Sequence, residues 1–90
     1  MRESKIEGYL TRRATECGAL VRKLKWIGRN GAPDRVVMHK GRAFWVELKA
    51  PGKEPEPHQL REHARMRAVG QHVIVIDSLS AVDYFVGMYL

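Results

Sequence analysis

The sequence predicts an α/β fold, built on a small mixed sheet of about four strands flanked by helices. Two segments rich in β-branched and aromatic residues flank Lys40-Gly41, a pair typical of a two-residue hairpin turn. A helix-like segment then precedes a short strand of valine and isoleucine, which is the order expected of a crossover between parallel strands. With 90 residues, the chain is expected to form one domain covering residues 1–90.

The N-terminal third predicts a helix followed by a strand. Residues 3–17 form the helix, and Gly18 ends it. Residues 19–26 (ALVRKLKW) form the strand, and 27–32, with two glycines and an asparagine, form a loop. The expected buried stripe of the helix has helical spacing and comprises Ile6, Tyr9, Leu10, Ala14 and Cys17.

The central hairpin sets the position of the acidic residues. Strands over 35–39 and 42–48 joined at Lys40-Gly41 place Arg35 opposite Val46. One step further, Asp34 lies opposite Glu47. The two carboxylates are therefore expected within reach of a shared cation.

The C-terminal half predicts a helix, a strand and a second helix. Residues 50–57 contain three prolines and a glycine and form a loop, and the helix over 57–69 begins at a proline and ends at Gly70. Residues 73–77 (VIVID) are an almost wholly apolar strand of the kind buried within a sheet. Ser80-Ala-Val-Asp83 resembles a capping box that opens the last helix.

Composition indicates a polyanionic partner and no membrane. The net charge is +6, and no apolar run is long enough to span a bilayer. Cys17 is the single cysteine, so no disulfide forms within the chain and a reducing, cytoplasmic setting is expected. An aromatic total of seven residues gives a thin core, so a homodimer is expected.

Basic residues are spread along the chain, and the simplest alternative is an ordinary solvated surface. A charge excess beside a cation-binding motif favours nucleic acid. The candidate nucleic-acid contacts are Arg29, Arg35 and Lys53.

Glu47 and Lys49 are two residues apart on a strand and therefore share a face with Trp45, while Phe44, Val46 and Leu48 face the core. The alternative is a solvent-facing ion pair of little energetic consequence. A charged pair on a central strand is costly unless it has a function. We therefore favour a catalytic carboxylate and lysine.

Asp34 follows Pro33 at the head of its strand, where an aspartate is often only a local backbone cap. Its register opposite Glu47 favours a metal ligand instead. Mg²⁺ or Mn²⁺ suits two carboxylates, the backbone carbonyl of Leu48 and waters. Lys49 would then orient or deprotonate the attacking water, or stabilise the charge developing on a phosphate.

Two further side chains complete the candidate site. The first helix offers Glu3 and Glu7, and Glu3 lies closer to the centre of the apolar stripe, so we favour it as the helix acid. A helix N-terminus favours acids through its dipole, which is the alternative for both. Gln59, in the first turn of the helix after the proline loop, is either a ligand of water or phosphate or a solvated amide.

These residues resemble the PD-(D/E)xK nuclease superfamily, whose signature is matched by Pro33-Asp34 and Glu47-Leu48-Lys49. The chain is more closely similar to the virus-type replication-repair nuclease (VRR-NUC) family. That resemblance covers nearly the whole chain and rests on an early Glu-rich helix, Gly31-Ala-Pro-Asp-Arg35, Val46-Glu-Leu-Lys-Ala-Pro51, Gln59, and Gly70 with the valine-rich strand after it.

The resemblance implies a restriction-endonuclease-like core and a Mg²⁺- or Mn²⁺-dependent DNA endonuclease of a kind associated with DNA repair. Short stand-alone members, mostly from phages and bacteria, resemble Holliday-junction resolvases and act as homodimers. The resemblance therefore implies branched DNA as the substrate and a bacterial cell or phage-infected host as the setting. Carried over by position, Asp34 and Glu47 are metal ligands, Lys49 is catalytic, Glu3 is the helix acid and Gln59 the auxiliary amide. Flaps, nicks, linear duplex, or DNA binding without catalysis are the alternatives.

Overall fold

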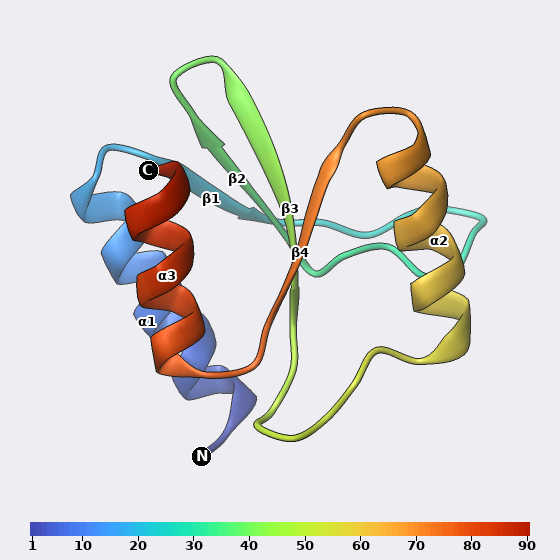
Figure 1. Ribbon diagram of the computed structural model, residues 1–90, viewed down its shortest axis with the longest axis horizontal. Coiled ribbons are helices and arrows are strands. Elements are labelled where there is room, and N and C mark those ends of the chain that lie inside the picture. Colours follow the sequence, from blue (N-terminus) through green and yellow to red (C-terminus); the bar gives the residue numbers. More distant parts are fainter.

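The computed structural model describes residues 1–90 as a sheet with helices on both faces. Helices α1 and α3 lie side by side on one face, and α2 covers the other (Figure 1). None of the helices combines the length with the hydrophobicity that a bilayer span requires. The elements in chain order are α1 (Glu3–Glu16), β1 (Leu20–Lys23), β2 (Arg35–His39), β3 (Arg42–Leu48), α2 (Pro57–Ala68), β4 (His72–Ile76) and α3 (Leu79–Tyr89).

The sheet has the strand order β1-β2-β3-β4 and is mixed, as expected. Strands β1, β2 and β3 pair antiparallel, whereas β3 and β4 pair parallel through the α2 crossover. The hairpin register is the predicted one, with Arg35 opposite Val46. Lys40 and Gly41 both have positive φ (50° and 78°), the backbone of a type I′ turn, which matches the right-handed twist of the two strands.

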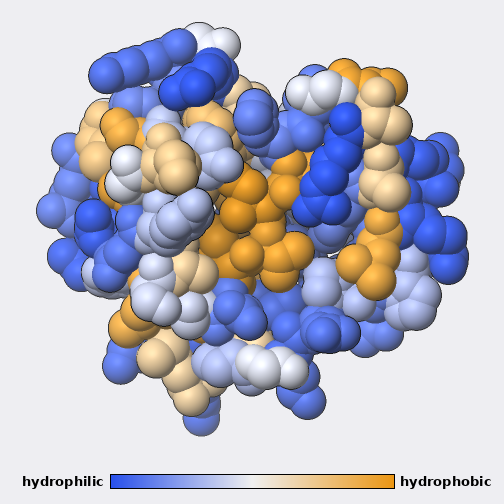
Figure 2. All heavy atoms as spheres, in the orientation of Figure 1, coloured by the Kyte–Doolittle hydropathy of each residue, from blue (hydrophilic) through white to orange (hydrophobic).

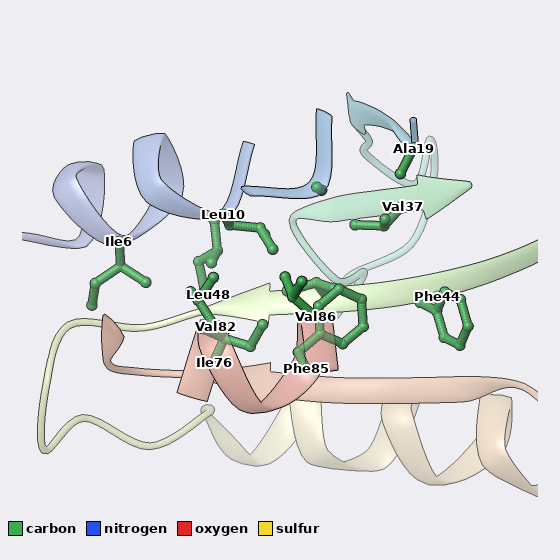
Figure 3. Packing of buried hydrophobic residues seen from close by; sticks show 12 residues of the cluster. Ile6, Leu10, Ala19, Val37, Phe44, Leu48, Ile76, Val82, Phe85 and Val86 are labelled. Atoms are coloured by element: carbon green, nitrogen blue, oxygen red, sulfur yellow. The ribbon is translucent and has the colours of Figure 1, made fainter. Parts of the chain in front are cut away.

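The apolar core lies between the sheet and the α1/α3 pair (Figure 3). The β3 residues predicted to face the core, Phe44, Val46 and Leu48, are all buried. Phe44 meets Phe85 of α3 edge to face, with ring centroids 5.6 Å apart. The remaining members are Ile6, Leu10, Ala14, Ala19, Val37, Ile76, Val82 and Val86.

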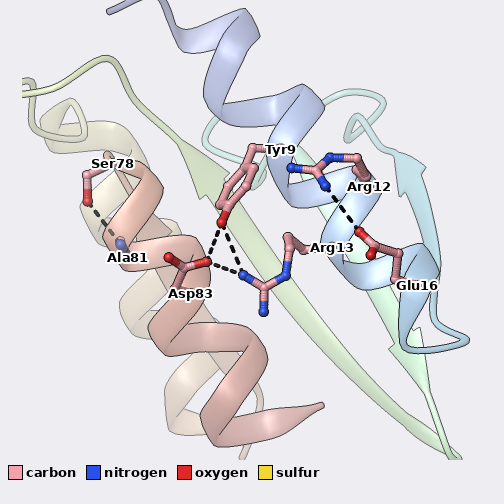
Figure 4. Close-up of polar contacts among 7 residues, drawn as sticks. All are labelled: Tyr9, Arg12, Arg13, Glu16, Ser78, Ala81 and Asp83. Atoms are coloured by element: carbon pink, nitrogen blue, oxygen red, sulfur yellow. Dashed lines mark hydrogen bonds and ion pairs between the residues drawn. The ribbon is translucent and has the colours of Figure 1, made fainter.

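A polar contact joins the two helices that cover the core (Figure 4). The Tyr9 hydroxyl donates a hydrogen bond to Asp83 Oδ1 at 2.6 Å, and Arg13 contacts both side chains. The first turn of α3 is capped by Ser78, whose Oγ accepts from the Ala81 amide at 3.0 Å. The predicted cap at Ser80 is therefore wrong by two residues, because Asp83 is committed to α1 and Ser78 has the extended backbone that a cap requires.

Two further expectations about the N-terminal third are wrong. Strand β1 covers only Leu20–Lys23, because the chain leaves the sheet before Trp26, whose indole turns towards α2. The expected apolar stripe of α1 stops at Ala14, and Cys17 is exposed at the C-cap. Gly18 follows with φ +86°, as predicted for the residue that ends the helix.

Candidate active site

The Glu47 carboxylate is buried on the α2 face of the sheet. It is 1 % exposed, which excludes the solvent-facing ion-pair row considered from the sequence. Lys49 Nζ lies 3.3 Å from Glu47 Oε2 on the same face of the chain, and the Lys49 side chain is 17 % exposed. A largely buried carboxylate and ammonium therefore lie side by side at the end of β3, as the spacing on the strand predicts.

Asp34 lies at the head of β2, one step beyond the Arg35–Val46 pair and therefore level with Glu47. Its Oδ2 accepts a hydrogen bond from the Leu48 amide at 2.9 Å, and its backbone carbonyl accepts from the Leu24 amide at 3.1 Å. The carboxylate is thus fixed across the hairpin rather than capping its own turn. Burial of Pro33 holds the turn before it.

Gln59 joins this pair from the first turn of α2. Its Nε2 donates to Glu47 Oε2 at 2.9 Å, while its Oε1 accepts from the Glu56 amide at 2.7 Å. The second contact caps the helix, and it fixes which end of the amide points at Glu47. Gln59 is therefore a member of the Glu47 site rather than a solvated surface amide.

The electrostatics of Glu47 suit a cation. Burial, followed by the nearby Asp34 carboxylate, raises the pKa of Glu47 to about 7, against the opposing effect of Lys49 and Gln59. Its second oxygen, Oε1, is buried with no hydrogen-bond partner. A buried acceptor without a donor is unfavourable in the absence of a positively charged ligand.

These residues fit a hard divalent cation. No third histidine, cysteine or acidic side chain joins Asp34 and Glu47 in a ligand cluster. Mg²⁺ is commonly bound by one or two carboxylates while it keeps several waters, so two carboxylates with a carbonyl and waters form a suitable donor set. The unpartnered Glu47 Oε1 is the observation in this structure that supports such a site.

The helix acids are placed differently from the expectation. Glu3 is exposed and makes no hydrogen bond or ion pair, so its inward orientation was wrong. Glu7 is half-buried and ion-paired with Arg35, whose Nη1 donates to the Asp34 carbonyl at 2.9 Å. The hydrogen bond that Arg35 donates to the Glu7 carboxylate is the main cause that lowers the pKa of Glu7. Glu7, and not Glu3, is therefore connected to the site.

The three candidate nucleic-acid contacts differ in solvent exposure and in the partners that they already have within the chain. The Arg35 side chain is only 12 % exposed, and its guanidinium forms an ion pair with Glu7 and a hydrogen bond to the Asp34 carbonyl. Arg35 therefore holds the backbone of the site in place rather than being free to contact DNA. Lys53 is exposed in the loop before α2. Arg29 is 58 % exposed at 3.7 Å from the Glu62 carboxylate, on the α2 side of the molecule.

Sequence reasoning missed a polar inner face on α2. Gln59, Glu62, His63 and Met66 have the spacing of a buried stripe, and the last three are buried, whereas Leu60 is exposed. Glu62 accepts hydrogen bonds from the Trp26 indole (2.7 Å) and from Arg65 (2.9 Å). The helical spacing of these four residues could have indicated a buried stripe. Three of the four are polar, however, and a polar stripe does not resemble an apolar core.

Comparisons with known proteins agree with this geometry. No family model matches the chain. A curated protein named "Putative nuclease p44", from Acyrthosiphon pisum secondary endosymbiont phage 1, is 47% identical over 79 residues, which covers 87% of this chain and 85% of that protein. A solved structure titled "VRR_NUC domain" is 41% identical with a TM-score of 0.90, covering 98% of this chain and 97% of the other.

Fold and motif together define a PD-(D/E)xK nuclease domain, in which an acid behind a turn meets a Glu-x-Lys strand. The chain belongs to the VRR-NUC family of that superfamily. The restriction-endonuclease-like mixed sheet expected from the resemblance is confirmed.

Proposed function

We propose that this protein is a divalent-cation-dependent DNA endonuclease, with Asp34, Glu47 and Lys49 as its catalytic core. The observation that carries the proposal is the buried Glu47 carboxylate, whose Oε2 contacts Lys49 and Gln59 while its Oε1 lacks a partner. The Asp34 carboxylate lies close enough to raise the pKa of Glu47. Family membership and a net charge of +6 favour a nucleic-acid substrate.

Each side chain has a role in phosphodiester hydrolysis. Asp34, Glu47 and the Leu48 carbonyl would hold Mg²⁺ or Mn²⁺, which supplies a more acidic bound water and neutralises charge on the phosphate. Lys49 Nζ orients the attacking water or donates to the developing oxyanion. Gln59, fixed at both ends, keeps the Glu47 carboxylate in one orientation. Arg35 holds the Asp34 backbone in place.

Branched DNA, with four-way junctions first, is the proposed substrate, and the active unit is a homodimer. Strand β4 forms an edge of the sheet. Apolar atoms gather over β4 between α3 and α2 (Figure 2), and Tyr84 beside it is exposed. An unpaired edge with apolar flanks is suited to association with a second copy, and a twofold pair would present two sites to two strands.

A labelled four-way junction, a flap, a nicked duplex and a linear duplex, assayed at matched concentration, test the proposal. We expect Mg²⁺ or Mn²⁺ to support cleavage, EDTA to abolish it, and the junction to be cut fastest. Asp34→Ala or Lys49→Ala should lower the cleavage rate by at least about 10²-fold while DNA binding persists.

Undiminished cutting by either variant would overturn the assignment of the site. Cleavage that favours flaps, nicks or linear duplex would retain the chemistry and replace the substrate. Binding without product on every substrate would indicate a catalytically silent DNA-binding module. Light scattering on the same sample tests the dimer, and a monomer mass with full activity would exclude it.

A further inference from the structure

A basic hollow lies beside the candidate active site. Its volume is about 350 Å³, and no apolar or acidic residue lines it. Two elements form it, the loop between β1 and β2 and the outer side of α2. Its lining residues are Gly28, Arg29, Asn30, His58, Arg61 and Arg65.

The hollow is built into the same framework as the site. A Cβ on Gly31 would lie 2.7 Å from the His58 carbonyl oxygen and 2.8 Å from Glu62 Cβ, so the loop backbone is pressed directly against α2. That loop leads into Asp34, and His58 immediately precedes Gln59. A group held in the hollow is therefore tied to the segments that carry both a proposed metal ligand and the amide on Glu47.

The charge of the hollow is not neutralised within the chain. Glu62 is the one acid beneath it, and it accepts from Arg65 at 2.9 Å and lies 3.7 Å from Arg29. Three arginines against one carboxylate leave a formal charge of 3 − 1 = +2. Arg61 is exposed and makes no hydrogen bond or ion pair, so its guanidinium is free for a ligand.

The three arginines of the hollow suit a phosphate diester as the ligand. Guanidinium groups present planar paired donors that match phosphate oxygens, and two of the three are already oriented by Glu62. We propose that the hollow binds a backbone phosphate of the DNA other than the one that is cleaved, with Arg61 as the free contact and Arg29 and Arg65 as the anchored ones. The inference rests on the proposed function and adds to it a residue-level contact that sets where the strand lies.

The test measures DNA binding separately from cleavage. A fluorescent junction is titrated, at several salt concentrations and with Ca²⁺ in place of Mg²⁺, against Asp34→Ala protein with and without Arg61→Ala. We expect Arg61→Ala to weaken binding by about tenfold, the loss of one charge-assisted contact. The slope of log K against log salt should fall by about 0.9, the value for one phosphate.

Arg12→Ala is the matched control, because Arg12 is an exposed arginine on α1, across the sheet from α2. It removes the same charge and should change affinity by less than about twofold. Arg61→Lys, which keeps the positive charge but lacks the planar paired donors of the guanidinium, should restore part of the affinity. In an otherwise wild-type chain, Arg61→Ala should raise KM more than it lowers kcat.

Equal weakening by Arg12→Ala and Arg61→Ala would overturn the proposal, since only net charge would then matter. Displacement of the DNA by polyglutamate as readily as by an oligonucleotide of equal charge would point to an acidic protein partner and would also overturn it. Binding is measured in a cleavage-deficient background. The effect of Arg61→Ala on affinity can therefore be interpreted even if the protein proves not to be a nuclease. Circular dichroism of each variant confirms that it is folded.

Discussion

The two faces of the sheet bury different kinds of side chain. Between the sheet and α1/α3, the buried cluster is wholly apolar. Between the sheet and α2, the buried residues include Glu47, Glu62 and His63, with Met66 and Val73 as the apolar members. One of the two layers beside the sheet is thus filled largely with polar groups.

Hydrogen bonds attach α2 to the rest of the molecule at three points. Gln59 bonds Glu47, Glu62 bonds Trp26, and Arg67 bonds the Val73 carbonyl at 2.7 Å. Such contacts contribute about 1 kcal/mol each, whereas a buried aromatic side chain contributes several. The α1/α3 face therefore supplies the stability that permits unfavourable charges to be buried beneath α2.

Truncation on the apolar face tests this division most strongly. Phe85→Ala should lower the free energy of unfolding by about 3–5 kcal/mol, because Phe85 is 1 % exposed and packs edge to face on Phe44. Urea denaturation measures the loss. Met88→Ala on the same helix, at a position 56% exposed, is the control and should cost less than about 1 kcal/mol. Similar losses at the two positions would contradict the assignment of the core.

Adding one methyl group at Gly31 tests how closely the loop before β2 packs against α2. Gly31→Ala should lower the free energy of unfolding by about 2–4 kcal/mol, since φ is +97° and the new Cβ would meet the His58 carbonyl at 2.7 Å. Gly28→Ala has similar strain, with φ +76°, but no neighbour within 4 Å, so it should cost only about 1 kcal/mol. Thermal unfolding of the pair measures the difference. Equal costs would mean that the loop is not pressed against α2.

The apolar face was predictable from sequence to a greater extent than the polar face. Periodicity identified Phe44, Val46 and Leu48 as core, and the Lys40-Gly41 turn fixed the hairpin register. Boundaries shifted where a side chain had a distant partner, as at the cap of α3. Local patterns carry no information about contacts such as that between Tyr9 and Asp83, 74 positions away.

The site was predictable where it depends on strand geometry. The register alone places Asp34 opposite Glu47, and the strand period places Lys49 on the same face as Glu47. The structure brings Gln59 to Glu47. Helix orientation was not predictable for Glu3, because its position one turn before Ile6 lies beyond the packed part of α1. The residues of α2 were missed because a polar stripe at helical spacing looks like a solvated face until its partners are known.

His63 makes the polar face sensitive to acid. It is fully buried, and both ring nitrogens lack partners. Burial first, and then the charge of Arg67, lowers the pKa of His63 below its usual 6.5, and the opposing carboxylates do not offset this. Below pH 6.5 the unfolded chain therefore takes up a proton that the folded chain does not. The contribution of His63 to stability should therefore fall with decreasing pH from that point, by up to about 1.4 kcal/mol per pH unit. Glu47, whose pKa is raised to about 7, acts in the opposite direction, because below pH 7 its carboxylate takes up a proton in the folded chain before it does so in the unfolded chain.

Denaturant unfolding at pH 5, 6, 7 and 8 measures this slope. His63→Leu should gain stability relative to the wild type as the pH falls from 6.5 to 5, because leucine does not titrate and only the opposing effect of Glu47 remains. His58→Gln, at an exposed position on the same helix, should leave the slope in place. A profile for His63→Leu that parallels the wild type would assign the acid sensitivity to another group.

The smallest expected change in unfolding free energy comes from Glu47→Gln, which should separate the catalytic role of Glu47 from its effect on stability. Glu47→Gln removes a buried charge that lies beside Asp34, while its remaining carbonyl oxygen can still accept from Gln59 and Lys49. The variant should lose cleavage activity and yet gain roughly 1 kcal/mol of unfolding free energy at pH 8 without divalent cations. Glu54→Gln, exposed in the loop before α2, should change neither property. Added Mg²⁺ should stabilise the wild type and not Glu47→Gln, since only the intact carboxylate pair offers the cation a site. A Glu47→Gln protein less stable than the wild type would mean that Lys49 and Gln59 already compensate the buried charge, and that the polar face needs no cation to complete it.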